Sequence, residues 1–197
     1  MAVRVAFFAA LLWGGPVLGN SFGSDEDAPF EVCALCHSLD GVSRMAKFPK
    51  LAGQPTPYIA KQLFDFTNGV RQNDGGQMMA IVTEISPDDI PIVARWFSMQ
   101  SAPLPMDVGD VSAGKMAFEM LGCLACHDSA RANDMTPHLT AQHAGYLQKQ
   151  MLEFRDGIRA NDPGGMMRAA MRGLTDSQIS ELATYLAATT REHYETR

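Results

Sequence analysis

The chain has 197 residues, of which 46% are hydrophobic and 19% are charged, a composition typical of a globular protein rather than a disordered one. Its formal net charge is −6, and neither half of the sequence is basic. Nucleic acid is therefore excluded as an expected partner, because binding to a phosphate backbone requires a cationic surface.

The first residues predict a secretory signal peptide over residues 1–19. Arg4 precedes an apolar run that ends at Trp13, and small residues follow before Asn20. A membrane anchor is the alternative, but a Gly-Gly-Pro sequence interrupts the run well short of the roughly 20 residues that a spanning helix needs. No later stretch is long and apolar enough to span a bilayer, so we expect a mature protein outside the cytoplasm without a transmembrane helix.

Two long stretches of the chain match each other in one register. Gln54 to Asp74 repeats as Gln142 to Asp162, with identical tyrosine, lysine, glutamine, phenylalanine, glycine, arginine and asparagine residues 88 positions apart. Such a match indicates an internal duplication. We predict two domains, over residues 20–100 and 110–197, joined by a proline-rich linker at 101–109.

Each copy has helical periodicity, and neither shows β-alternation of useful length. In the first copy, residues 58–66 form an amphipathic run that Gly69 is expected to end. The second copy opens with a predicted helix over 112–121, whereas the equivalent part of the first is short and acidic, with Asp27 as a candidate cap. The pattern predicts an all-α fold.

The final helix of each copy has a recognisable start. Ser86 is the expected N-cap in the first copy, with Pro87 next and Asp89 completing a capping box. Thr175 and Gln178 occupy the corresponding positions in the second copy. Apolar residues then recur at helical spacing, so both helices are expected to bury one face.

All four cysteines lie in Cys-X-X-Cys-His motifs: Cys33, Cys36 and His37 in the first copy, and Cys123, Cys126 and His127 in the second. Two thiols at this spacing reach the two vinyl groups of one haem and form thioethers, and the next residue places an imidazole beneath the iron. We therefore predict two covalently bound haem c groups, with these histidines as proximal ligands.

Other uses of the cysteines fit less well. Disulfides within such close pairs would close almost no chain. A shared zinc site would require pairs 90 residues apart to converge and would leave both histidines without a role. A thioredoxin-type redox motif needs a βαβ context that the sequence lacks.

A methionine from each copy is the predicted sixth ligand of its iron. Met78 and Met167 are the methionines that coincide between the copies, and each precedes the final helix by the same distance. Both lie far enough beyond their histidines for the chain to wrap around a haem. Met79 and Met166 are the competing neighbours, and core packing is the alternative role of any methionine.

Other repeated residues have two open interpretations. A backbone carbonyl near Pro49 and Pro137 is a candidate acceptor for the Nδ1–H of each motif histidine, although both prolines also suit ordinary turns. The remaining repeated polar pairs bond either haem propionates or the other domain, with a solvated helix face favoured for the lysines: Tyr58 and Tyr146, Arg71 and Arg159, Lys61 and Lys149.

Several unrepeated or apolar residues have plainer expected roles. His138, His143 and His193 have no counterpart in the other copy and are expected to be surface residues. Packing roles are expected for Met45, Met151, Met171, Trp96 and Tyr185.

Taken together, these motifs resemble the dihaem cytochrome c4 family. The resemblance rests on the duplicated haem motif, the stretch from Phe48 to Gln54, the Tyr-X-X-Lys-Gln helix and the Arg-X-Asn-Asp sequence before a methionine-rich segment. It implies two tandem cytochrome c-type haem domains about a pseudo-twofold axis, each iron held by His and Met, in the bacterial periplasm. Peripheral association with a membrane is compatible with it.

In that family the protein passes electrons from quinol-oxidising complexes towards terminal oxidases, so an electron-transfer protein rather than an enzyme is expected. The alternative is the electron-accepting cytochrome subunit of a periplasmic dehydrogenase. The truncated start of the first copy resembles the cytochrome subunit of flavocytochrome c sulfide dehydrogenase. A dihaem peroxidase or gas-binding protein would need an open iron position, which the paired methionines argue against.

Overall fold

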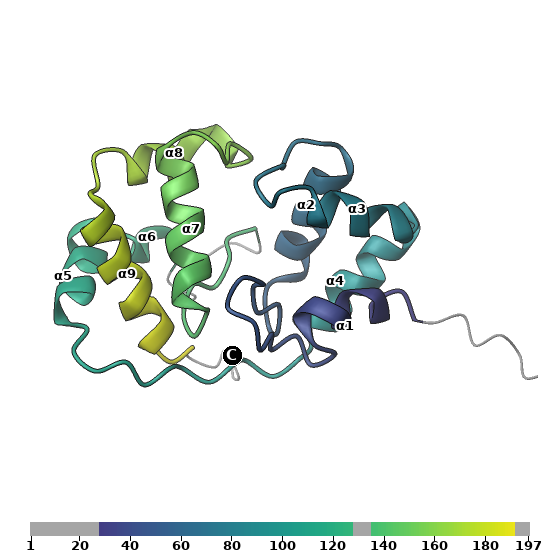
Figure 1. Ribbon diagram of the computed structural model, residues 1–197, viewed down its shortest axis with the longest axis horizontal. Helices are drawn as coiled ribbons and strands as arrows, with labels where there is room; N and C mark the ends of the chain where they lie inside the picture. Colours follow the sequence, from purple (N-terminus) through teal and green to yellow (C-terminus); the bar gives the residue numbers. More distant parts are fainter. Residues whose placement is uncertain (1–27, 128–134, 192–197) are drawn as a thin grey trace, which may run out of the picture.

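The computed structural model describes residues 28–127 and 135–191, and every regular element in these ranges is a helix. Two helical lobes lie side by side, and residues 101–109 run between them without helical structure (Figure 1). The expected signal peptide, Asp27, His193 and the segment that follows the second motif histidine lie outside the described residues. No helix in the described part has the length and apolar character needed to cross a membrane.

The first lobe is built around one helix pair. Its helices are α1 (Glu31–His37), α2 (Thr56–Thr67), α3 (Gln77–Ile81) and α4 (Ile90–Ser98), with short 3₁₀ turns η1 (Val82–Glu84) and η2 (Pro87–Asp89) before α4. The predicted amphipathic faces meet in the core, where Leu63 and Phe66 of α2 and Val93 and Phe97 of α4 are buried. Gly69 has φ 68° just after α2, the conformation expected of a helix-ending glycine.

The second lobe repeats this plan and adds an opening helix. Its elements are α5 (Ser112–Met120), α6 (Leu124–His127), α7 (Ala144–Arg155), η3 (Pro163–Gly165), α8 (Met166–Met171) and α9 (Asp176–Ala188). Leu147 and Phe154 of α7 pack with Ile179 and Leu182 of α9. The predicted opening helix is confirmed, and α5 crosses α9 closely enough for Gly114 to lie against Glu181.

The two final helices begin differently. Thr175 Oγ1 accepts a hydrogen bond from Gln178 N–H, and Gln178 Oε1 accepts one from Thr175 N–H, so the predicted capping box is present. Ser86 accepts instead from Asp88 N–H and caps the 3₁₀ turn that precedes α4. The capping box predicted for Asp89 is therefore wrong, because the 3₁₀ turn delays the α-helix to Ile90.

Aromatic packing also differs between the lobes. In the second lobe Phe118 of α5 contacts Tyr185 of α9. In the first lobe Phe30, just before α1, stacks on Trp96 of α4, with ring centroids 3.8 Å apart and planes within 5°. The packing roles expected for Trp96 and Tyr185 are confirmed, and the described start of the first lobe covers α4 with one aromatic ring where the second lobe uses a helix.

The methionines expected to pack do so with one exception. Met151 and Met171 are buried in the core of the second lobe. Met45 is 45% exposed, so the packing role expected for it is wrong. It lies in the irregular segment between α1 and α2, where no helical periodicity constrains which way a side chain points.

We predict that the α5–α9 crossing tolerates no side chain at Gly114. A Cβ at this position would lie 2.1 Å from the Glu181 carbonyl oxygen and 2.7 Å from Tyr185 Cβ. Gly114→Ala is expected to lower the free energy of unfolding by about 1–3 kcal/mol, measured by denaturant titration, because the helices must move apart.

Gly145→Ala is the matched control. This exposed glycine of α7 has nothing within 4 Å of an added Cβ, so the same change is expected to be neutral or stabilising by up to ~1 kcal/mol. Equal effects of the two substitutions would contradict the close crossing.

Candidate functional site

The first motif lies on α1, which brings its three functional side chains together. Cys33 and Cys36 are three residues apart and therefore share a face of the helix, and His37 is its last residue. Both cysteines are free thiols. Burial raises the pKa of the Cys33 thiol to about 11, so this group is a neutral thiol within the core.

The second motif has the same order but is more open. Cys123 precedes α6, and Cys126 and His127 lie on it. Cys123 is half-buried and packs against the core of the second lobe, whereas Cys126 is exposed. Both are free thiols. In the described part of the chain no three His, Cys, Asp or Glu side chains lie close enough to hold a metal ion by themselves, the four motif cysteines included.

Each motif histidine is held by the backbone carbonyl of a proline. His37 Nδ1 lies 2.8 Å from Pro49 O, and His127 Nδ1 lies 3.0 Å from Pro137 O. A carbonyl only accepts, so Nδ1 carries the proton and Nε2 keeps a free lone pair. Burial lowers the pKa of both histidines, which favours this neutral form. The expected carbonyl acceptors are therefore confirmed, and they belong to the two prolines themselves.

The candidate methionines occupy equivalent positions. Met78 is the second residue of α3 and Met167 the second residue of α8. Each helix follows a glycine in the left-handed conformation, Gly76 at φ 85° and Gly165 at φ 70°. Both methionines pack against the core of their own lobe.

Their neighbours are more exposed. Met79 is 37% exposed and Met166 is 60% exposed, on the sides of α3 and α8 that face solvent. A sulfur atom that serves a buried site must be turned towards the core, so the packing favours Met78 and Met167 over these competitors.

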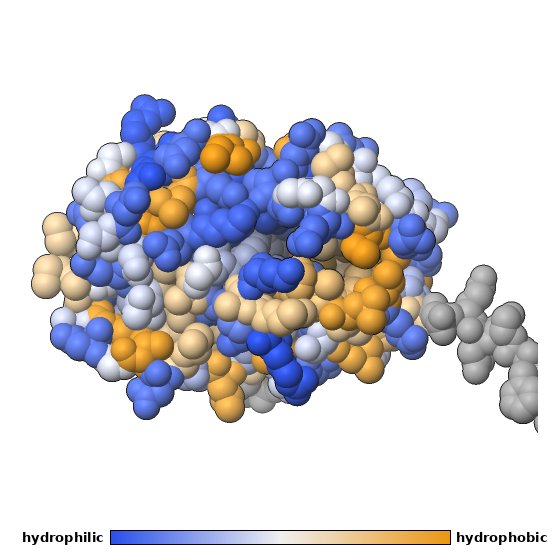
Figure 2. Space-filling model, viewed as in Figure 1, coloured by the Kyte–Doolittle hydropathy of each residue, from blue (hydrophilic) through white to orange (hydrophobic). Residues whose placement is uncertain are grey.

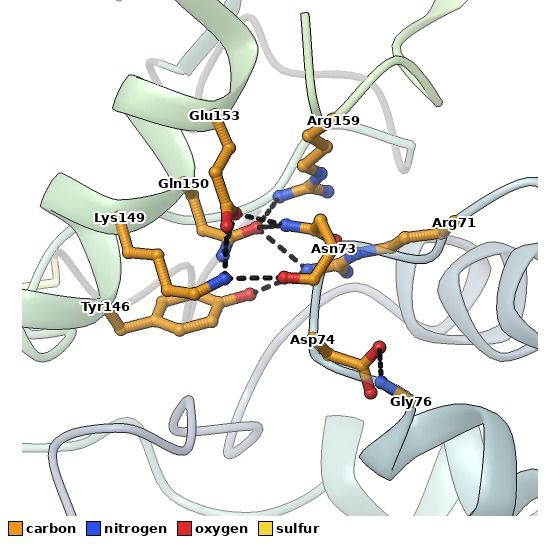
Figure 3. A network of polar contacts seen from close by, with 9 residues as sticks. All are labelled: Arg71, Asn73, Asp74, Gly76, Tyr146, Lys149, Gln150, Glu153 and Arg159. Carbon is orange, nitrogen blue, oxygen red and sulfur yellow. Dashed lines mark hydrogen bonds and ion pairs between the residues drawn. The ribbon is translucent and has the colours of Figure 1, made fainter. Parts of the chain in front are cut away.

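A buried polar network joins the two lobes, and Figure 3 shows the half that surrounds Arg71. Its guanidinium donates to Gln62 of its own lobe at 2.8 Å and, across the interface, to Gln150 at 2.9 Å and Tyr146 at 3.3 Å. Asn73 donates to the same Gln150 oxygen at 3.0 Å. Hydrophilic residues gather over the boundary between the lobes on the face drawn in Figure 2.

The other half of the network repeats the bonds to the two glutamines with the lobes exchanged. Arg159 donates to Gln150 of its own lobe at 2.7 Å and to Gln62 across the interface at 3.0 Å. Asn161 donates to the same Gln62 oxygen at 3.0 Å. Each glutamine oxygen thus accepts from an arginine of both lobes, and the interface has pseudo-twofold symmetry.

Both lysines for which a solvated helix face was favoured bond the other lobe, the alternative that the sequence left open, although Lys149 is itself exposed. Lys61 Nζ donates to Asn161 O at 2.9 Å, and Lys149 Nζ donates to Asn73 O. Each also pairs with an acid four residues on, Asp65 and Glu153 respectively. The favoured expectation was wrong for Lys61, because helical spacing shows only which face a lysine shares within its own lobe.

Two histidines expected at the surface also lie between the lobes. His143 Nε2 lies 2.8 Å from Ser43 O of the first lobe. His138 pairs through its backbone with Gln54, and its pKa falls to about 4, mainly through burial and also through the charges of Arg191 and His127. The absence of a histidine at the equivalent positions of the other copy does not indicate exposure.

Three residues that the sequence left without a role complete the interface. Gln54 and Gln142, each 4% exposed, bond the backbone of the opposite lobe. Arg191 bridges the lobes by donating to Ala52 O at 2.6 Å and Thr140 O at 3.5 Å, and burial lowers its pKa to about 10. Exact recurrence pointed to the glutamines, whereas Arg191 has no repeated partner that would have drawn attention to it.

The residues present fit a covalently attached haem in each lobe. Each motif presents two free thiols and, at the next position, an imidazole whose Nε2 is available, buried in the first lobe and partly buried in the second. A methionine packs on the core of the same lobe. An all-helical chain with two such sets is a c-type cytochrome with two haem domains.

Comparison with known proteins agrees with this class. Residues 111–190 match the family model described as cytochrome c. The chain is 34% identical to cytochrome c4 of Pseudomonas aeruginosa over 167 residues, which cover 79% of this chain and 82% of that protein. It is 30% identical to a thiosulfate dehydrogenase electron acceptor of Thiomonas intermedia, with 94% of this chain and 89% of that protein covered.

The crystal structure of reduced recombinant cytochrome c4 from Pseudomonas stutzeri is also similar, with a TM-score of 0.71 at 29% identity, covering 84% of this chain and 98% of that chain. The chain belongs to the dihaem cytochrome c4 family. It carries two covalently bound haem c groups and is an electron carrier.

We predict that Arg71 is required for the lobes to dock. Arg71→Gln removes a buried donor that bonds four side chains of the two lobes, so a loss of about 2 kcal/mol in the free energy of unfolding is expected in urea. Arg95→Gln makes the same chemical change on the exposed face of α4 and is expected to stay within ~0.5 kcal/mol of the original. Equal losses would rule out a special role of Arg71.

Proposed function

We propose that this protein is a periplasmic single-electron carrier in which His37 and Met78 ligate one haem iron and His127 and Met167 the other. The observation that carries the proposal is the equivalence of the two lobes. Each presents a histidine whose Nδ1 is committed to a proline carbonyl, and a methionine second in a short helix on the same core.

This arrangement suits electron transfer better than catalysis. Each haem, when bound, supplies a one-electron iron couple whose potential an axial thioether raises. The carbonyls of Pro49 and Pro137 orient the imidazoles, and the core-facing methionines Met78 and Met167 would supply the thioether that leaves no open position on the iron for small molecules. A peroxidase or gas-binding protein needs that side open.

The methionine assignment predicts a difference between neighbouring positions. Met78→Ala is expected to give one haem a high-spin ferric spectrum and rapid carbon monoxide binding when reduced, because nothing then fills its sixth position. Met79→Ala is the matched control and should leave both spectra unchanged. Met167→Ala and Met166→Ala should repeat the contrast for the other haem.

If instead the substitutions of Met79 or Met166 changed the spectrum, these residues and not Met78 or Met167 would be the ligands. Carbon monoxide binding to the unsubstituted protein would overturn the closed, six-coordinate carrier.

We further propose that a periplasmic dehydrogenase is the electron donor, and a terminal oxidase the acceptor. The similarity along 94% of the chain to a protein named thiosulfate dehydrogenase electron acceptor supports this donor. A quinol-oxidising complex is the second candidate donor, supported by the similarity to cytochromes c4. The signal sequence over residues 1–19 supports the compartment.

The two donors predict different kinetics. A purified thiosulfate dehydrogenase with thiosulfate is expected to reduce the protein within the enzyme's turnover time in a stopped-flow experiment. A quinol-oxidising complex with quinol should do so much more slowly if it is not the partner. Fast reduction only by the quinol-oxidising complex would reverse the assignment.

A further inference from the structure

The peptide group whose carbonyl accepts the hydrogen bond from each motif histidine makes a second hydrogen bond, through its N–H, to the other lobe. Pro49 O accepts from His37, and the N–H of the same peptide group, that of Lys50, donates to Gln142 Oε1 at 2.8 Å. Gln142 Nε2 returns a bond to Lys50 O at 2.9 Å. A continuous chain of hydrogen bonds therefore runs from the histidine of the first lobe to a glutamine of the second.

The equivalent series of hydrogen bonds, with the lobes exchanged, is also present. Pro137 O accepts from His127, and the N–H of His138 donates to Gln54 Oε1 at 3.0 Å. Gln54 Nε2 donates to His138 O at 2.8 Å. The second lobe's histidine is thus linked to a glutamine of the first lobe through one peptide group.

These bonds are shielded and fixed. Gln54 and Gln142 are each 4% exposed, and Lys50 is 6% exposed, so water does not compete for the peptide groups. Gln142 Oε1 also accepts from His143 N–H at 3.0 Å, which ties the side chain to the start of α7. Gln54 leads into α2 in the same way and is held by its own N–H to Leu51 O at 3.1 Å.

Hydrogen bonds that share one peptide group strengthen each other. An acceptor on the N–H polarises the amide and makes its carbonyl a better acceptor, an effect of about 10–30% per bond. A stronger bond to Nδ1 makes the imidazole a more basic ligand. A more basic ligand stabilises the oxidised iron and lowers its reduction potential.

We propose that Gln142 and Gln54 are positioning residues that lower the reduction potential of the haem in the opposite lobe. The inference rests on the proposed ligation by His37 and His127. Its consequence is that each lobe sets the electron affinity of the other through the backbone, so the two potentials depend on the lobes being docked.

The test is a pair of substitutions with a crossed readout. Gln142→Leu removes the acceptor for Lys50 N–H and is expected to raise the potential of the first-lobe haem. Gln54→Leu should raise that of the second-lobe haem. The expected size is about threefold in the ratio of reduced to oxidised haem at a fixed solution potential, or ~28 mV at 59 mV per tenfold.

The measurement is a redox titration followed by NMR, in which resolved haem methyl signals are assigned to a lobe with the Met78→Ala and Met167→Ala proteins. Gln72→Leu is the control, because this exposed side chain bonds only Gly69 O among the described contacts. It should move neither potential. A shift confined to the substituted lobe, equal shifts of both haems, or no shift would each overturn the proposal.

Gln142→Glu separates polarisation from simple loosening of the interface. An ionised carboxylate accepts Lys50 N–H more strongly but cannot donate to Lys50 O, so the first-lobe potential should fall while a loosened interface would move it as the leucine variant does. This variant also decides the matter if the leucine proteins fail to fold, since an unchanged or raised first-lobe potential overturns the proposal. Normal six-coordinate spectra in all variants would leave the assigned ligands standing whichever way the potentials move.

Discussion

Buried polar groups between the lobes are the constraint on which the rest of this molecule depends. Arg71 and Arg159 are 6% and 7% exposed, and each is fully paired only when the opposite lobe supplies a glutamine oxygen. Separating the lobes would leave each guanidinium with part of its donors unpaired in a region built to exclude water, and half-satisfied networks of this kind are costly. The network therefore makes the two lobes one structural unit rather than two independent domains joined by a linker.

The same constraint explains which parts of the duplicated chain resemble each other most. Matched residues such as Gln62 and Gln150 must serve their own lobe and the other one at once. Residues at the outer ends of the lobes contact only their own lobe, and there the copies differ. Phe30 stacks on Trp96 in the first lobe, and α5 packs on α9 in the second. The arginines, asparagines and glutamines that recur in both copies therefore lie at the interface, although single positions there, such as Lys50 and His138, also differ.

Much of the fold could be predicted because it depends on local chemistry. Helical spacing located α2, α4, α7 and α9, and the register of the duplication selected Met78 and Met167, which the structure places at equivalent positions. The interface could not be predicted in this way. Lys61 and His138 were misjudged because their partners lie in the other copy, and hydrophobic periodicity carries no information about a partner 84 or 100 residues away.

The contacts between the lobes are arranged like those of an isologous dimer, but within one chain. In such a contact residue i meets j and j meets i, so every bond occurs twice. Covalent linkage of the two halves frees the copies to diverge at single positions. Lys50 and His138 occupy equivalent positions and both pair through the backbone with a glutamine of the opposite lobe, and Lys50 also donates from its side chain to Ala141 O at 2.8 Å. Because these positions follow the prolines that hold the motif histidines, a difference there reaches the surroundings of one histidine and not the other. A duplicated chain can thus keep a symmetric scaffold and still make its two electron-transfer centres unequal.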